Sequence, residues 1–291
     1  MLGKSTMSKL LFCCCMISAI CRGNEIIHYD FDAGSGTIVD DSVASNDGSL
    51  CSFAFDGVSD WSINHPMPVD GSGFNYVGNN SLSFDKNNTA MNYLYIPGSA
   101  ALKPTSAVTY QFWIKDDIQP SIGDASFSYL GGQLESFYME RYFNGSNYLR
   151  YRIGLKNSGF GGSWWAWPIY TDVIVPVDGQ WHNVAFTYDA STKHAIGYID
   201  GQISLDNDLA IAGLSNYTLA SDGAVNGILF GIAPQNGFRR ASFLMDEFAM
   251  YNEALLGNAI ANNMLNIPEP SCILLLAAGI ALTRNKFSKK A

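Results

Sequence analysis

The 291-residue sequence has little cysteine away from its two ends. Five of its six cysteines lie within residues 1–23 and 267–291, which leaves Cys51 alone in the stretch between them. One cysteine cannot form an intrachain disulfide, and a chain of this length can bury a core without one. We interpret Cys51 as a small buried hydrophobic residue rather than a reactive thiol.

Basic residues are also scarce in the stretch between the two ends. Seven of the 17 lysines and arginines and one of the 26 acidic residues lie in the terminal segments, so the rest carries ten basic and 25 acidic residues, a net charge of −15. Such a surface disfavours nucleic acid and anionic membranes as partners, and it favours solubility and cations. We therefore expect no nucleic-acid partner.

Several local signatures of catalysis are missing. The four histidines, His28, His65, His182 and His194, show no metal-ligand spacing such as H-x-x-x-H. The sequence contains neither a G-x-S-x-G nucleophile turn nor a Walker loop. These absences argue against the enzyme classes that depend on those motifs.

Strand signals are strong in residues 178–205. Apolar and polar side chains alternate from Trp181 to Tyr188, which is typical of a β-strand because successive side chains switch faces. A polar break leads to a second strand, His194 to Ile199, and Asp200-Gly201 then marks a tight turn. The pattern predicts an antiparallel meander.

This stretch resembles the central signature of the laminin-G-like, concanavalin A-like jelly-roll domains. The matching motifs, in chain order, are HYDFD with GSGT (28–37), NDGSL (46–50), SLSFD (81–85), YIP (95–97), YQFWIK (110–115), DGQWHNVAFTYD with GYIDGQ (178–202) and MDEFAMYN (245–252). The resemblance covers nearly everything between Glu25 and Met264. It implies an all-β, two-sheet antiparallel jelly-roll sandwich that forms a single domain, residues 24–266.

Within this fold we expect Trp181 to Tyr188 to be an interior strand. Phe243 to Tyr251 should lie beside the first strand, Glu25 to Phe31. The stretch Ser52 to Asn80 is rich in Asp, Gly, Asn and Pro and is interpreted as loop. Glu253 to Leu265 is expected to form one or two helical turns.

The N-terminal residues 1–23 have the pattern of a secretory signal peptide, expected to be helical. Lys4 and Lys9 precede an apolar run from Leu10 to Ile20, and small or polar residues follow. The alternative is lipidation at Cys21, but Ile20 stands where a lipobox needs a small residue.

The C-terminal residues 267–291 resemble the PEP-CTERM sorting tail of Gram-negative bacteria. Pro268, Glu269 and Pro270 precede an apolar run, Cys272 to Leu282, and a basic end. The resemblance implies export, transient anchoring in the inner membrane by one hydrophobic helix, removal by an exosortase, and a final location at the cell surface or outside the cell. The alternative is an ordinary single-span anchor, although the run is short against the ~20 residues that a span needs.

Aromatic residues are dense between Asp116 and Asp178. After a glycine-rich turn come four candidate ligand-binding residues, Trp164, Trp165, Trp167 and Tyr170. Flat aromatic faces suit sugar rings, because axial C–H groups pack on π-systems. The alternative is that Trp164 and Trp167 are buried and only Trp165 is partly exposed.

Calcium is the candidate cofactor. The resembling domains often hold Ca²⁺ at a loop rim through oxygen ligands. By that resemblance, the pairing of the first and closing strands would bring together Asp32, Asp41, Asn46 and Asp246. The alternative is that Asp41 and Asn46 satisfy backbone groups of a turn and that Asp246 ties strand ends.

The sequence therefore leaves two classes of function. A retaining glycosidase needs two carboxylates facing one cleft, and the E-x-D-x-x-E run of the resembling glucanases is absent. We favour an exported, non-catalytic binding or adhesion module for extracellular glycan or a polysaccharide matrix. The alternative is a glycoside hydrolase of the same fold.

Overall fold

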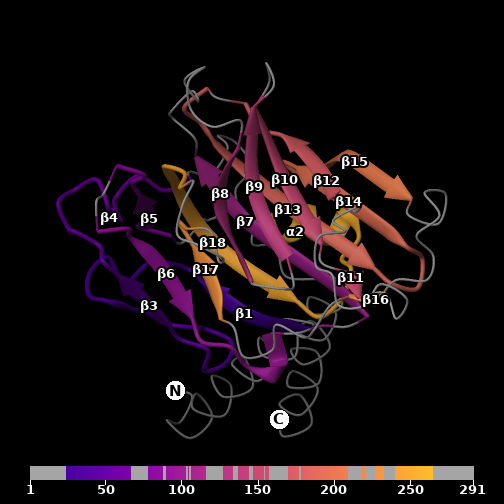
Figure 1. Cartoon of the computed structure of the whole chain (residues 1–291), viewed down its shortest axis with the longest axis horizontal. Coiled ribbons are helices and arrows are strands. Elements are labelled where there is room, and N and C mark those ends of the chain that lie inside the picture. The colour runs from indigo at the N-terminus through magenta and orange to yellow at the C-terminus, as the bar shows by residue number, and fades with distance from the viewer. Residues whose placement is uncertain are drawn as a thin grey trace, which may run out of the picture.

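A computed structural model describes residues 24–66, 78–87, 90–102, 104, 106–115, 127–133, 137–143, 147–153, 155–156, 170–176, 178–208, 218–219, 227–232 and 240–264. Two antiparallel sheets form a sandwich, as expected for a jelly roll (Figure 1). Every ladder between the named strands is antiparallel. The predicted all-β, two-sheet fold is confirmed.

We call the first sheet sheet A. Its strand order is β15-β14-β13-β7-β18-β5-β4, and β1 pairs with β18 beside this path. The strands are β1 (Glu25–Tyr29), β4 (Asp60–Ser62), β5 (Ser81–Phe84), β7 (Ala107–Lys115), β13 (Trp181–Asp189), β14 (His194–Ile199), β15 (Gln202–Asp208) and β18 (Phe243–Tyr251).

We call the second sheet sheet B. Its strand order is β12-β10-β9-β8-β17-β6-β3-β2. The strands are β2 (Ile38–Val39), β3 (Gly48–Cys51), β6 (Tyr93–Ile96), β8 (Phe127–Gln133), β9 (Phe137–Phe143), β10 (Asn147–Ile153), β12 (Tyr170–Ile174) and β17 (Ile228–Phe230). A small separate ladder joins β11 (Leu155–Lys156) to β16 (Thr218–Leu219), and η1 (Ala100–Leu102) and α2 (Gly257–Met264) are helical.

The interior position of β13 follows from its alternating sequence. Val184, Phe186 and Tyr188 lie in the core between the sheets, whereas Ala185 belongs to a second apolar cluster on the other face. Since β13 pairs with both β7 and β14, it is an interior strand, and β18 lies beside β1. Both predictions of strand position are confirmed.

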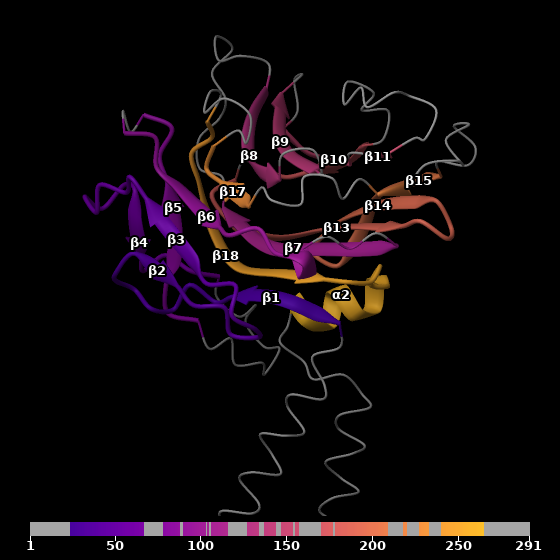
Figure 2. The same cartoon turned by 60° about the horizontal axis from the view of Figure 1, so that its bottom comes forward.

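The second apolar cluster lies where α2 packs on the face of sheet A turned away from sheet B (Figure 2). Ile260 of α2 is fully buried there. The side chain of Gln111, on β7, donates hydrogen bonds to Asn183 Oδ1 and to the carbonyl of Ile260, each at 2.9 Å. Its own oxygen accepts a 3.4 Å bond from Asn263, so one buried amide ties the helix to the sheet.

The described chain enters and leaves the sandwich at one corner. The carbonyl of Asn24 accepts a 2.8 Å bond from the backbone N–H of Asn252. Near the end of α2, the Asn263 side chain donates to the Tyr251 hydroxyl at 3.2 Å, and Tyr251 pairs with Glu25 of β1. Asn24 and Asn263 therefore both neighbour Tyr251.

Two local expectations were wrong. The stretch interpreted as loop contains β4, whose three residues pair with β5. The first strand ends at Tyr29, two residues early, because Phe31 has a left-handed φ of 53° that breaks the extended backbone.

The predicted signal and tail helices lie outside the described residues. Within the described part of the chain, no helix is long and apolar enough to cross a membrane.

Candidate functional site

The outer face of sheet B, turned away from sheet A, carries aromatic and charged positions in ordered rows. Phe137 and Met139 of β9 lie in the core. Because side chains alternate along a strand, Tyr138 and Glu140 belong to the outer face.

The central row contains most of the charge. Backbone register aligns Tyr129, Glu140, Arg150 and Asp172 across β8, β9, β10 and β12. Directly opposite residues share a face of a sheet. Two acidic positions and one basic position are therefore gathered on one surface although they lie far apart in the sequence.

Aromatic positions flank this row on both sides. One neighbouring row aligns Tyr138, Arg152 and Tyr170, and the other aligns Tyr142, Tyr148 and Ile174. We call these ten positions the sheet B platform: Tyr129, Tyr138, Glu140, Tyr142, Tyr148, Arg150, Arg152, Tyr170, Asp172 and Ile174.

Described side chains of the platform range from buried to exposed. The rings of Tyr129 and Tyr138 meet edge to face, with centroids 5.7 Å apart. Glu140 is 4% exposed, while Ile174 is 52% exposed at the far row. Tyr138 is buried and Tyr129 is half-buried. A nearly buried carboxylate beside a half-buried tyrosine can orient a polyol by hydrogen bonds while the ring packs on its C–H face.

One of the four predicted ligand-binding residues falls on this platform. Tyr170 begins β12, in register with Arg152. Trp164, Trp165 and Trp167 lie outside the described residues. The other platform residues were missed as a site, although their aromatic alternation marks three neighbouring strands.

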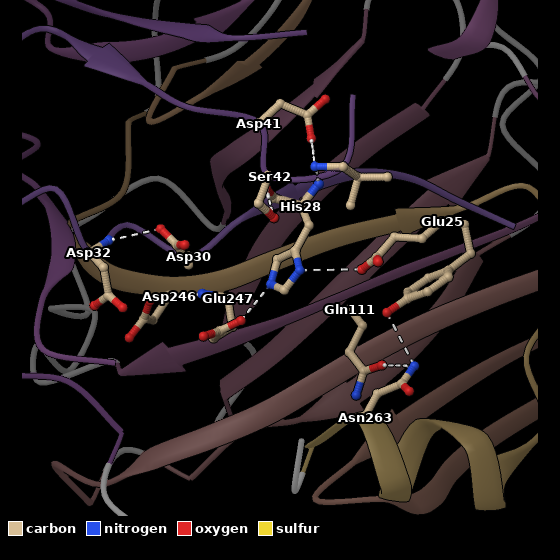
Figure 3. A network of polar contacts seen from close by, with 12 residues as sticks. Glu25, His28, Asp30, Asp32, Asp41, Ser42, Gln111, Asp246, Glu247 and Asn263 are labelled. Carbon is tan, nitrogen blue, oxygen red and sulfur yellow. Dashed lines mark hydrogen bonds and ion pairs between the residues drawn. The ribbon is translucent and has the colours of Figure 1, made fainter. Parts of the chain in front are cut away.

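The acidic turn after β2 is built around Asp41. Its Oδ1 accepts from the backbone N–H groups of His28 and Val43, each at 3.1 Å (Figure 3). Its Oδ2 accepts from the backbone and side-chain N–H groups of Asn46, at 3.2 and 3.1 Å. The hydroxyl of Tyr29 donates to the carbonyl of Asn46, which fixes the same turn from the core side.

The other two predicted calcium ligands have separate partners. Asp32 Oδ1 accepts from the backbone N–H groups of Asn79 and Asn80, at 2.5 and 3.3 Å. Asp246 is fully buried on β18 and accepts from the backbone N–H of Glu247 at 2.8 Å. Figure 3 shows Asp41 set apart from both.

The structure thus joins Asp41 to Asn46 and leaves Asp32 and Asp246 elsewhere. Among the residues it describes, no three His, Cys, Asp or Glu side chains come together to hold a metal ion. The two Asp41 oxygens already accept four N–H groups, so this carboxylate fits a turn-stabilising role better than a calcium ligand. Calcium binding by the protein stays a prediction.

His28 links β1 to β18 near this turn. Its Nε2 lies 2.5 Å from a carboxylate oxygen of Glu247, and its Nδ1 lies 3.4 Å from Glu25 (Figure 3). Glu247 has a left-handed φ of 49° inside a β-bulge of β18. The bulge places Glu247 toward His28, because an extra residue re-aims the following side chain.

A second histidine lies between two carboxylates at the start of β13. His182 Nδ1 is 2.9 Å from Asp200, and its Nε2 is 3.3 Å from Asp178. The hydrogen bond with Asp200 is the main reason that the pKa of His182 lies above its ordinary value of 6.5, and partial burial opposes this rise. The pKa of Asp178 is lowered, first by the backbone N–H of Gln180 and less by His182.

The family described as the Concanavalin A-like lectin/glucanases superfamily matches residues 87–261. No curated protein sequence matches the chain.

Solved structures with a similar fold include toxin binding domains. The binding domain of Paraclostridial Mosquitocidal Protein 1 is 14% identical, with a TM-score of 0.54, over 84% of this chain and 52% of that one. The binding domain of botulinum neurotoxin serotype G is 13% identical, with a TM-score of 0.52, over 82% and 50%. A structure of botulinum neurotoxin type C, whose cell entry depends upon interaction with two ganglioside molecules, is 11% identical, with a TM-score of 0.51, over 84% and 51%.

The chain spans about half the length of these structures. At such low identity, the structural similarity shows a shared fold. It does not carry the ligands of the toxins over to this chain.

Proposed function

Because the chain belongs to the Concanavalin A-like lectin/glucanases superfamily, we propose that it is an exported, non-catalytic module that binds extracellular glycan on the sheet B platform. The observation that carries this proposal is the row of Tyr129, Glu140, Arg150 and Asp172 between aromatic rows. Charged groups set in an aromatic surface are what a sugar needs, since each ring of a glycan has both hydroxyl and C–H faces.

The charge of the module also supports a glycan partner. Between its terminal segments the chain carries a net charge of −15, which disfavours polyanions. The charge of the platform is more balanced than that of the whole module, because Arg150 and Arg152 accompany Glu140 and Asp172 there. A neutral or mildly acidic glycan therefore suits the platform better than a nucleic acid or an anionic lipid.

Likeness to binding domains supports a non-catalytic role. Two of the similar toxin structures are named as binding domains, and cell entry of a third similar toxin, botulinum neurotoxin type C, depends upon interaction with gangliosides. Tyr170 is part of the platform, and Trp164, Trp165 and Trp167 stay candidate ligand-binding residues.

A specific observation keeps the hydrolase alternative in view. Glu140 and Asp172 occupy one row two strands apart, a backbone separation of about 9.6 Å at ~4.8 Å per strand. Inverting glycosidases hold their two carboxyl groups roughly 6.5–9.5 Å apart. The backbone spacing of this pair is close to that range, and Arg150 stands between the two acidic positions in the same row.

One experiment separates binding from hydrolysis. A glycan array is probed with the wild-type protein, with and without EDTA, and its best ligand is then titrated against Tyr129→Ala and Glu140→Gln. We expect Tyr129→Ala to weaken binding about tenfold, roughly 1.4 kcal/mol, because tyrosine is enriched among the interface residues whose truncation costs more than about 1 kcal/mol.

Phe55→Ala is the matched control, since Phe55 is an exposed aromatic on the loop between β3 and β4. Its affinity should equal that of the wild type. Equal affinity of Tyr129→Ala and wild type would remove the platform from the proposal. Release of reducing sugar that Glu140→Gln abolishes would establish the hydrolase alternative. An effect of EDTA on binding would support the predicted calcium.

Export and processing complete the proposed function. A signal peptide at residues 1–23 would direct the chain out of the cytoplasm of a Gram-negative bacterium. The PEP-CTERM-like segment would anchor it briefly in the inner membrane until an exosortase removes the tail. The support for both steps is the arrangement of basic and apolar residues in the sequence.

A further inference from the structure

We propose that one corner of the domain lies against the membrane surface while the tail anchors the chain, so that the sheet B platform faces away from the lipid. This corner, the exit corner, consists of Asn24, Tyr251, Asn252, Leu256 and α2. The inference rests on the proposed membrane insertion of the tail and is independent of glycan binding.

Chain entry and chain exit coincide at the exit corner. Asn24 exchanges backbone and side-chain hydrogen bonds with the turn after β18, at 2.8 Å to Asn252 and 3.4 Å to Glu253. Asn263 reaches the Tyr251 hydroxyl at 3.2 Å. Any segment that precedes residue 24 or follows residue 264 therefore starts from the same place on the domain.

The connections to the two apolar runs are short. Residues 265–271 separate α2 from the run that begins at Cys272, and seven residues span at most about 25 Å. On the other side, residues 21–23 separate Asn24 from the end of the first run, a reach of about 10 Å. Basic residues follow the second run and precede the first, so both runs place the domain on the side opposite the cytoplasm.

The surface at the exit corner suits a nearby membrane. The helix α2, of sequence GNAIANNM, has no charged residue, although the domain as a whole is strongly acidic. Leu256, which immediately precedes α2, is 71% exposed. An acidic protein is repelled by anionic lipid. The uncharged α2 and the exposed Leu256 meet less of this repulsion than charged surface does, although the Glu253 carboxylate lies beside Asn24 at the edge of the corner.

The platform lies on the opposite side of the sandwich. Figure 2 shows α2 below sheet A, with β8, β9 and β10 above it. With the exit corner against the lipid, the platform points into the space outside the membrane, where a polysaccharide would meet it. The anchored precursor would then bind glycan before the tail is removed.

The test compares two cysteine positions in the full chain. All six native cysteines are replaced by serine, and Leu256→Cys or Ile174→Cys is added. Each protein is reconstituted in vesicles of zwitterionic and anionic phospholipid, and labelling by a bulky water-soluble maleimide is timed. Exposure alone predicts faster labelling at position 256, since Leu256 is 71% exposed and Ile174 is 52% exposed.

We expect the opposite order in vesicles. If the exit corner is free in about a tenth of orientations, labelling at position 256 falls about tenfold, because the reagent reacts only with the accessible fraction. Labelling at position 174 should match its rate in the soluble protein released by exosortase. Faster labelling at position 256 in protein that floats with the vesicles would overturn the proposed orientation alone. Failure of the full chain to float would overturn membrane insertion of the tail, and with it this inference.

Discussion

Asp41 shows how one carboxylate can organise a surface turn. Its two oxygens accept four N–H groups, three of them from the backbone, and the side chain is 7% exposed. Acidic and amide residues in a turn can form either a calcium site or a hydrogen-bonded turn. The sequence signal is the same for both roles, and the contacts of Asp41 favour the turn.

We expect Asp41→Ala to lower the free energy of unfolding by about 2–3 kcal/mol, because several partly buried N–H groups lose a charged acceptor. Asp40→Ala is the control, since Asp40 is an exposed neighbour. Urea unfolding with EDTA and with millimolar Ca²⁺ measures both variants. A loss of the same size in both conditions supports the turn role. A loss that appears only with Ca²⁺ would instead make Asp41 an ion ligand.

We expect His182 to make the stability of the protein depend on pH near neutrality. Its pKa is raised in the folded state by the hydrogen bond with Asp200. The stabilisation is therefore fully present below the ordinary pKa of 6.5 and is lost as pH rises through the higher folded value. We expect the melting temperature to fall between about pH 6 and pH 8 and His182→Gln to flatten that fall. The same slope in the variant would assign the dependence to other groups.

At the scale of elements, buried hydrogen bonds of Gln111 hold α2 against sheet A. Gln111 is 3% exposed and bonds to Asn183, to the Ile260 carbonyl and to Asn263. We expect Gln111→Leu to destabilise the protein by about 2 kcal/mol, since buried partners are left unsatisfied. Hydrogen exchange should then rise first in α2. The exposed Gln202→Leu on β15 is the control, and equal exchange in both variants would contradict the role of Gln111.

Strands were predictable where their pairing is local. The alternation of residues 181–188 predicted β13, and the polar break before His194 with the Asp200-Gly201 turn after Ile199 predicted β14. The short connection of residues 190–193 sets the register between these two strands. The central row of the platform was not predictable. It depends on β9, β10 and β12 pairing in one register, and Asp172 meets that row only through the fold. The bulge at Glu247 was not predictable either, because no signal in the local sequence marks the left-handed φ of this residue.

At the scale of the molecule, the tail prediction remains to be tested. Pro268 and Pro270 cannot continue a helix or a central strand, so they should separate the sandwich from the membrane segment. We expect protein exported by the native cell to lack the tail. A Pro268→Ala, Pro270→Ala variant should keep it and stay in the inner membrane. Mass spectrometry of both decides, and an intact C-terminus on the exported protein would make the segment a plain anchor.

The meeting of Asn24 and Asn263 beside Tyr251 has a consequence for how the domain can be rearranged. Ends this close can be joined by a short linker, and new ends can be opened at an exposed turn such as Ser191–Thr192 between β13 and β14. The same closeness lets the whole sandwich be inserted into a surface loop of another protein without stretching its host. The sandwich is therefore suited to transfer, as an intact domain, into proteins with other domain arrangements.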